Sequence, residues 1–300
     1  MYNSYMLYKS LIDFSSPYDN EIVITGIVRN VAGTFLEDYL RLTMAFKNFR
    51  SVKWFLVESD SEDNTLNVLK STSDLNSNFS WCTLGKLEKQ MRSRAERLAI
   101  ARNRYVVELQ KDDYISANII VVADFNGLSN LINEEAILSC WKLHNWSACT
   151  ANQSGRYYDI WALRHPLWSP NDCWKQYEFF NQYSKFPELT LFSAVHSRMI
   201  KIPSDSDWIE VESAFGGLAV YDASVFKYAK YSGHDSKGEE TCEHVKFNQL
   251  INKEGGKIFI NPRMINTKYT DHSINSSFYS VLARIIKYPI KKLKQIKSQI

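Results

Sequence analysis

The 300-residue sequence lacks any run of about 18 unbroken apolar residues, so it predicts no membrane-spanning helix. Its first twenty residues, MYNSYMLYKSLIDFSSPYDN, contain neither a continuous apolar core nor a cleavage-like site, which argues against a signal peptide. It has only five cysteines, and none of them form a CxxC pair. This odd, unpaired set is typical of reduced structural thiols, and we expect a cytoplasmic protein.

Several nucleotide-binding and hydrolytic motifs are also missing. The sequence contains no GxGxxG, no GxxxxGK[ST] and no GxSxG. The absence of these motifs argues against a dinucleotide-dependent dehydrogenase, a P-loop protein and an α/β-hydrolase. The glycine pair Gly216–Gly217, in SAFGGLAVYD, indicates either a bulge or a close backbone approach to a ligand.

Charge is unevenly distributed along the chain. The net charge is +3, but the last stretch, FYSVLARIIKYPIKKLKQIKSQI, holds six basic residues and no acid, so residues 1–277 carry −3. A mildly acidic body argues against a nucleic-acid-binding protein. Apolar residues recur at helical spacing in this tail, which predicts a basic amphipathic helix over 278–300, kinked at Pro289, on an anionic membrane surface. A tail that packs on the body or is disordered is the alternative.

Strand and helix patterns alternate through the first 130 residues or so. Apolar strands are predicted in EIVITGIVRNVAG, VKWFLVESDSEDNT and NIIVVADFNG, with a helical pattern after each of the first two and over residues 88–110. This order predicts an α/β fold, in which a mostly parallel twisted central sheet is flanked by helices. We expect one domain over 1–277, with a nucleotide-binding half at about 21–133 and an acceptor half at about 134–277.

Polar residues follow three of the predicted strands, at Arg29–Asn30, Glu58–Asp60 and Asp124–Asn126. The carboxyl ends of parallel strands meet at one edge of a sheet, where ligands bind. The oxygens of Asp124 and Asn126 suit Mn²⁺ or Mg²⁺ on a diphosphate, but a simple turn explains these residue types equally well.

Two helical segments carry further candidates. Arg102 and Asn103 lie near the end of an arginine-rich helix, and arginine is a bidentate phosphate ligand, whereas the other arginines there are expected to be solvated. Glu243 and His244 open the predicted helix in GEETCEHVKFNQLI. They could act as a base or metal ligands, or merely complement the helix dipole.

Six stretches together resemble the capsule-associated mannosyltransferase family, typified by the cryptococcal α-1,3-mannosyltransferase and its bacterial relatives. They are GIVRNVAG, FLVESDSEDNT, RAERLAIARNRYV, VVADFN, YYDIWALRHP and CEHVKFN, and the resemblance covers roughly residues 22–266. It implies a GT-A glycosyltransferase with one nucleotide-sugar site over the strand ends. The residues implied at the donor are Arg29, Glu58, Ser59, Asp60, Arg102, Asn103 and Asp124.

The resemblance also implies catalytic roles and an acceptor. Tyr158 and Asp159 would face the sugars, and Glu243 and His244 would lie near the acceptor. The metal-binding D-x-D of GT-A enzymes is D-x-N here, with ligands Asp124, the neutral Asn126 and His272. Because Asn126 brings no charge, the alternatives are a weaker cation, one that relies on His272 or His244, or none at all. The function implied is transfer of a hexose, such as mannose, from a GDP- or UDP-sugar to a glycan or lipid-linked glycan in capsule or lipopolysaccharide synthesis. The alternatives are a non-catalytic glycan-binding protein on the same fold and a nucleotide-sugar hydrolase.

Overall fold

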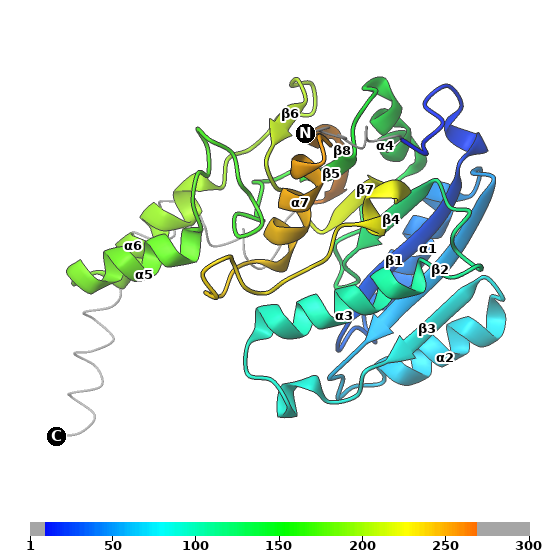
Figure 1. Ribbon diagram of the computed structural model, residues 1–300, viewed down its shortest axis with the longest axis horizontal. Helices are drawn as coiled ribbons and strands as arrows, with labels where there is room; N and C mark the ends of the chain where they lie inside the picture. Colours follow the sequence, from blue (N-terminus) through cyan, green and yellow to red (C-terminus); the bar gives the residue numbers. More distant parts are fainter. Residues whose placement is uncertain (1–9, 269–300) are drawn as a thin grey trace, which may run out of the picture.

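The computed structural model describes residues 10–268, which form one eight-stranded sheet with helices on both faces (Figure 1). His272 and the predicted amphipathic tail therefore lie outside the described residues. The strand order is β3-β2-β1-β4-β7-β5-β8-β6. The strands are β1 (Glu21–Val28), β2 (Ser51–Glu58), β3 (Phe79–Thr83), β4 (Ile119–Ala123), β5 (Ala148–Gln153), β6 (Ile209–Val211), β7 (Leu218–Asp222) and β8 (Ile258–Thr267).

The first half of the sheet is parallel. Strands β3, β2, β1 and β4 run in one direction and are joined through α1 (Phe35–Phe46), α2 (Thr65–Leu75) and α3 (Arg94–Glu108). Alternate residues of β1 point to opposite faces: Ile22 and Ile24 join the core under α1 and α2, while Val23 joins the core under α3. Each buried strand therefore contributes side chains to two hydrophobic layers. A shift of its pairing by one residue would exchange the two faces, so its register is fixed.

The second half makes the sheet mixed. Strand β7 is inserted antiparallel between β4 and β5, β8 pairs parallel with β5, and β6 closes the edge antiparallel to β8. The predicted α/β architecture with a mostly parallel sheet flanked by helices is thus confirmed, and the antiparallel pairs of β7 and β6 were not predicted. The remaining helices are α4 (Glu134–Leu138), α5 (Cys173–Tyr183), α6 (Pro187–Ala194) and α7 (Glu243–Lys253), with short 3₁₀ turns η1 (Pro17–Asp19), η2 (Leu87–Lys89), η3 (Ser139–Lys142), η4 (His196–Arg198) and η5 (Ala223–Lys227).

Helices α5 and α6 pack on each other as a pair that projects from the sheet, at the left of Figure 1. No helix within residues 10–268 is long and apolar enough to cross a membrane. All five cysteines are free, and all except Cys82 are buried.

One predicted boundary was wrong. The helical pattern over 88–110 suggested a single long helix, but α3 begins only at Arg94. The hydroxyl of Ser93 accepts a hydrogen bond from the backbone N–H of Glu96 at 3.2 Å and caps the helix there. The residues before Ser93 instead form the turn η2 and an extended segment. This late start places the amino end of α3 beside the edge of the sheet.

Candidate functional site

A pocket of about 900 Å³ lies at the carboxyl ends of β1, β2 and β4. Residues near the amino ends of α3, α5 and α7 form its other walls, so the helix ends face the sheet edge. Pockets of about 300–1,000 Å³ are the usual size for small-molecule sites. The predicted site residues on its wall are Arg29, Ser59, Asp60, Arg102, Asp124, Asn126, Tyr158, Asp159, Glu243 and His244.

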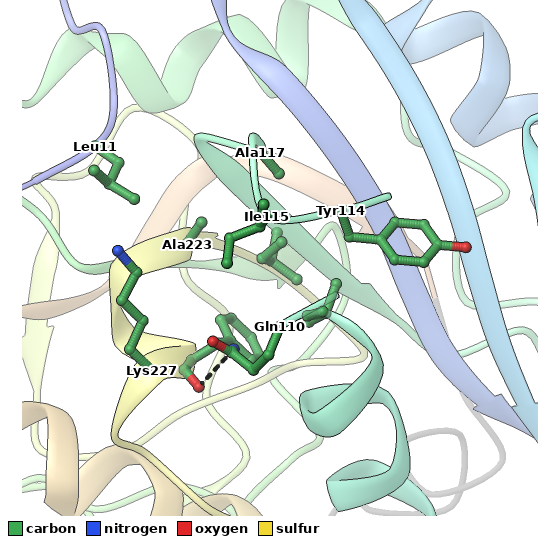
Figure 2. Close-up of a pocket in the computed structure, with 10 residues that line it drawn as sticks. Leu11, Gln110, Tyr114, Ile115, Ala117, Ala223 and Lys227 are labelled. Carbon is green, nitrogen blue, oxygen red and sulfur yellow. Dashed lines mark hydrogen bonds between the residues drawn. The ribbon is translucent and has the colours of Figure 1, made fainter. Parts of the chain in front are cut away.

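A second hollow lies between the end of α3 and η5 (Figure 2). Its volume is about 20 Å³, and Gln110 donates a hydrogen bond across it to the backbone carbonyl of Phe226 at 3.2 Å. A volume of this size holds about one water molecule. The larger pocket is therefore the candidate site.

The loop after β4 presents Asp124 and Asn126 to the pocket because Phe125, between them, points into the core. The Phe125 ring is buried and lies 5.6 Å from the ring of Phe35. Its burial contributes about 1.5–3 kcal/mol to the stability of this loop conformation. Asp124 keeps 29% of its side chain exposed, and Asn126 is exposed.

Asp38 of α1 fixes the same loop from below. Its buried carboxylate accepts hydrogen bonds from the backbone N–H groups of Gly127 at 2.8 Å and Ser129 at 2.9 Å. Burial raises the pKa of Asp38 to about 6, although these two bonds act in the opposite direction. Asp38 therefore positions Asp124 and Asn126 without touching the pocket, and the sequence analysis missed it.

A buried ion-pair network connects three walls of the pocket. The Nε of Arg102 lies 2.9 Å from Oε1 of Glu243, and its Nη2 lies 3.5 Å from Oδ1 of Asp124. The guanidinium also stacks over the rings of Phe215 at 5.1 Å and Tyr231 at 5.7 Å. Burial raises the pKa of Asp124, and the charge of Arg102 opposes that rise. Arg102 thus holds α3, β4 and α7 in one fixed arrangement.

His244 packs beside this network as a neutral imidazole. Its ring stacks on Phe215 with centroids 3.9 Å apart and is 2% exposed. Burial, together with the nearby charge of Arg102, lowers the pKa of His244 well below its usual value. Neither ring nitrogen has a hydrogen-bond partner among the described residues. Buried polar atoms without partners are uncommon, so His244 has free capacity to bind a ligand.

Asp159 faces the opposite wall, where Gly216 and Gly217 position it. Both glycines have positive φ angles, of 72° and 82°, which favour glycine. The N–H of Gly216 donates to Asp159 Oδ2 at 3.0 Å, and the carbonyl of Gly217 accepts from the N–H of Asp124 at 2.9 Å. Burial raises the pKa of Asp159 to about 6. The glycine pair therefore approaches two carboxylate residues of the site.

Asp172 lies outside the YYDIWALR stretch, but its carboxylate holds that stretch against α5. Its carboxylate caps α5 by accepting from the N–H groups of Trp174 and Lys175, and it also accepts from Trp161 Nε1 at 3.1 Å and pairs with Arg164 at 3.0 Å. Two tryptophans are thereby held at the pocket wall.

The loops after β1 and β2 fold onto each other, because Asn30 exchanges hydrogen bonds with Ser61 and Glu62. The N–H of Ser61 donates to the buried Glu58 carboxylate, which also accepts from the hydroxyl of Thr83. Asp60 has a positive φ of 64° and accepts from the N–H of Glu88 at 2.9 Å. Glu58 therefore organises the loop beneath the pocket, whereas Ser59 and Asp60 reach its wall.

Two predicted donor residues have other partners. Arg29 lines the pocket but pairs with Glu88 at 2.7 Å. Asn103 is absent from the pocket wall; its amide exchanges two hydrogen bonds, each of 2.9 Å, with the backbone of Tyr231. Asn103 thus fixes the segment whose aromatic ring contacts Arg102. Its contribution to the pocket is indirect.

The sequence analysis treated Arg94 and Arg97 as solvated helix residues, but both line the pocket. They lie on the same face of α3 as Leu98, Ala101 and Arg102. The spacing at 94, 97 and 102 was visible in the sequence, but the late start of α3 and its position against the sheet edge were not.

The predicted metal ligands fit a divalent cation only in part. Among residues 10–268, no group of three or more histidine, cysteine, aspartate or glutamate side chains is arranged to hold a metal ion. Asp124 is the one carboxylate of the predicted pair, and it already faces Arg102. His272 lies outside the described residues.

Comparisons with known proteins give structural likeness at low identity. No protein-family model matches the chain, and no curated protein matches it. One similar solved structure is a mannosyltransferase from Pyrobaculum calidifontis in complex with GDP-Man and Mn²⁺, with a TM-score of 0.44 and 10% identity over 84% of this chain and 57% of that one.

Two further similar structures have comparable values. Glucosyl-3-phosphoglycerate synthase from Mycobacterium tuberculosis, in complex with UDP, has a TM-score of 0.39 and 11% identity, covering 88% of this chain and 80% of that chain. S. aureus TarS has a TM-score of 0.43 and 11% identity, covering 89% and 64%. This chain therefore spans less than two thirds of the mannosyltransferase and of TarS.

Proposed function

We propose that this protein is a glycosyltransferase that moves a hexose, such as mannose, from a GDP- or UDP-sugar to a glycan acceptor. The observation that carries the proposal is one pocket of about 900 Å³ that joins arginines, carboxylates and a neutral histidine at the carboxyl edge of the sheet. Arginines suit a diphosphate and carboxylates suit sugar hydroxyls. The resemblance of the sequence motifs to capsule-associated mannosyltransferases supports the same assignment.

Different walls of the pocket bind the donor and the acceptor. The nucleoside binds at the ends of β1 and β2, near Arg29, Ser59 and Asp60, and the diphosphate lies toward α3. Asp159 and Glu243 face the transferred sugar and the acceptor. With a pKa of about 6, Asp159 is ionised at neutral pH and accepts a hydrogen bond or a proton from a sugar hydroxyl.

The acceptor approaches over α5. Trp174 lines the pocket with 42% of its surface exposed, and its ring lies 6.1 Å from that of Tyr177, one turn further along the helix. Aromatic rings combine an apolar face with, in tyrosine and tryptophan, a polar group, and both properties suit a sugar chain. A lipid-linked acceptor in capsule or lipopolysaccharide synthesis, reached from the inner face of the membrane through the basic segment 278–300, completes the proposal.

The test is nucleotide release from a panel of GDP- and UDP-hexoses in the presence of a glycan acceptor mixture. The wild-type chain is expected to release nucleotide from at least one donor, and Asp159→Asn is expected to lose at least about 90% of that rate, since removing a transition-state contact commonly costs tenfold or more. Asp74→Asn, the same change at an exposed position on α2, is the matched control. Equal rates in all three proteins would overturn the assignment of Asp159.

The same assay separates two other functions. A non-catalytic glycan-binding protein on this fold is favoured by one observation, the neutral Asn126 in place of a second acid. Such a protein would bind a glycan and release no nucleotide. A nucleotide-sugar hydrolase would release nucleotide at the same rate with and without acceptor.

A further inference from the structure

The positive charges on the α3 wall of the pocket share one helix face. Arg94, Arg97 and Arg102 all line the cavity, and the intervening Leu98 and Ala101 line it too. The positive end of the helix dipole lies at the first turn of α3, which Ser93 caps. Two of the arginines therefore lie in the part of the helix that is most favourable for an anion.

Arg94 and Arg97 form no ion pair within residues 10–268. Arg94 is exposed, and its charge acts on Asp124 only at a distance, where it opposes the rise in the pKa of Asp124 that burial causes. Nη1 of Arg97 donates to the backbone carbonyls of Met91 at 2.7 Å and Arg92 at 2.8 Å. Carbonyl bonds orient a guanidinium without cancelling its charge, so both residues can attract a diphosphate.

Arg102 has a different role, because it forms an ion pair with Asp124, the carboxylate on which a cation would depend. It is 3% exposed and is held at Glu243 and over Phe215, so its approach to Asp124 at 3.5 Å is part of the packed interior. Its Nη1 has no hydrogen-bond partner among the described residues. With Asn126 neutral, the attraction of this loop for a divalent ion is reduced to one carboxylate that already has a cationic neighbour.

We propose that Arg94 and Arg97 bind the diphosphate of the donor directly, while Arg102 balances Asp124, so that the pocket binds a nucleoside diphosphate without a divalent cation. This inference rests on the proposed function. Arg94 and Arg97, which were expected to be solvated, thereby become binding residues. Charges built into α3 also replace the expected Mn²⁺ or Mg²⁺. Arginine matches phosphate geometry through two parallel N–H donors, which a neutral glutamine cannot reproduce.

Calorimetric titration of GDP and UDP into the full chain, in EDTA and separately in Mn²⁺, tests the cation. For the nucleotide that binds, the dissociation constants in the two buffers are expected to agree within about threefold. A tenfold difference corresponds to about 1.4 kcal/mol of binding free energy, and EDTA removes no cation that contributes such an amount. A loss of tenfold or more in EDTA, restored by Mn²⁺, would overturn this inference and leave the proposed function in place. Absence of binding for both nucleotides in both buffers would contradict the proposed function, and this inference with it.

Matched arginine variants test the binding residues. Arg94→Gln is expected to weaken nucleotide binding about tenfold, the loss typical of one charge-assisted hydrogen bond. Arg92→Gln changes an exposed arginine two residues away that does not line the pocket, and its affinity should equal that of the wild type. Circular dichroism and the urea midpoint confirm that each variant is folded. Equal affinities for Arg94→Gln and Arg92→Gln would refute the assignment.

Asn126→Asp tests the loop from the other direction. Asn126 is exposed, so the added carboxylate does not disturb the core. The variant is expected to bind nucleotide at least tenfold more weakly than wild type in EDTA and to recover in Mn²⁺, because a second charged oxygen ligand favours a divalent cation on a diphosphate. An affinity that does not respond to Mn²⁺ would contradict the role given to Asn126.

Discussion

Substitution of Arg102 by methionine leaves the Glu243 carboxylate buried without its cationic partner. Both side chains are 4% exposed in the wild type, and their atoms lie 2.9 Å apart. Removing one member of a buried pair costs about 3–5 kcal/mol, because the other charge stays desolvated. At about 2–4 °C per kcal/mol for a domain of 150–250 residues, the Tm should fall by about 6–20 °C.

The same helix provides the control for this prediction. Arg104 pairs with Glu108 at 2.7 Å, but its side chain is 32% exposed, and its guanidinium also lies over an aromatic ring, that of Phe55. Arg104→Met should therefore cost only about 0.3–0.5 kcal/mol through its exposed i,i+4 pair. Urea unfolding followed by tryptophan fluorescence compares the two variants directly.

A double variant identifies the cause of the Arg102 effect. Arg102→Met combined with Glu243→Gln removes both charges, so it should recover about 0.5–3 kcal/mol relative to the sum of the two single changes. The reasoning would be refuted if Arg102→Met and Arg104→Met cost the same. It would also fail if the double variant were simply additive.

Three further predictions concern the loop, the carboxylates and the thiols. Asp38→Ala leaves two backbone donors without an acceptor and should cost about 2–5 kcal/mol in urea unfolding, whereas the exposed Glu37→Ala should stay within about 0.5 kcal/mol; equal midpoints would contradict the loop assignment. The pKa of Asp159 is raised by burial to about 6, above its unfolded value, so its contribution to stability is lost as the pH rises from about 4 to 6; the stability of Asp159→Asn minus that of the wild type should therefore increase across this range, and a constant difference would refute the shift. A thiol reagent should modify only Cys82 quickly in the native state and all five cysteines in urea, and rapid reaction at a second thiol would contradict the buried positions.

The edge of the sheet could be predicted from the sequence because its strands are local features. An apolar run that ends in Asp124 or Arg29 defines both the strand and the position of the polar residue after it. Parallel pairing then brings such ends together, as the register of β1 with β2 and β4 shows. The start of α7 at Glu243 followed from a local pattern as well.

Residues whose position depends on packing between distant segments could not be predicted. Asn103 has a side chain of the kind expected for a phosphate ligand, but its amide forms two hydrogen bonds with the backbone of Tyr231. Glu58 follows a strand as Asp124 does, but Thr83 and Ser61 bind its carboxylate beneath the loop. Asp38 gave no signal, because its partners are backbone groups about ninety residues away.

The proposed function requires the pocket between α3 and the carboxyl edge of the sheet to bind a nucleotide-sugar. A crystal structure of the full chain with a non-hydrolysable donor analogue tests it most directly. We expect the diphosphate within hydrogen-bond distance of Arg94 and Arg97, and the sugar beside Asp159. A donor bound elsewhere on the molecule, or a pocket that stays empty at saturating donor concentrations, would contradict it.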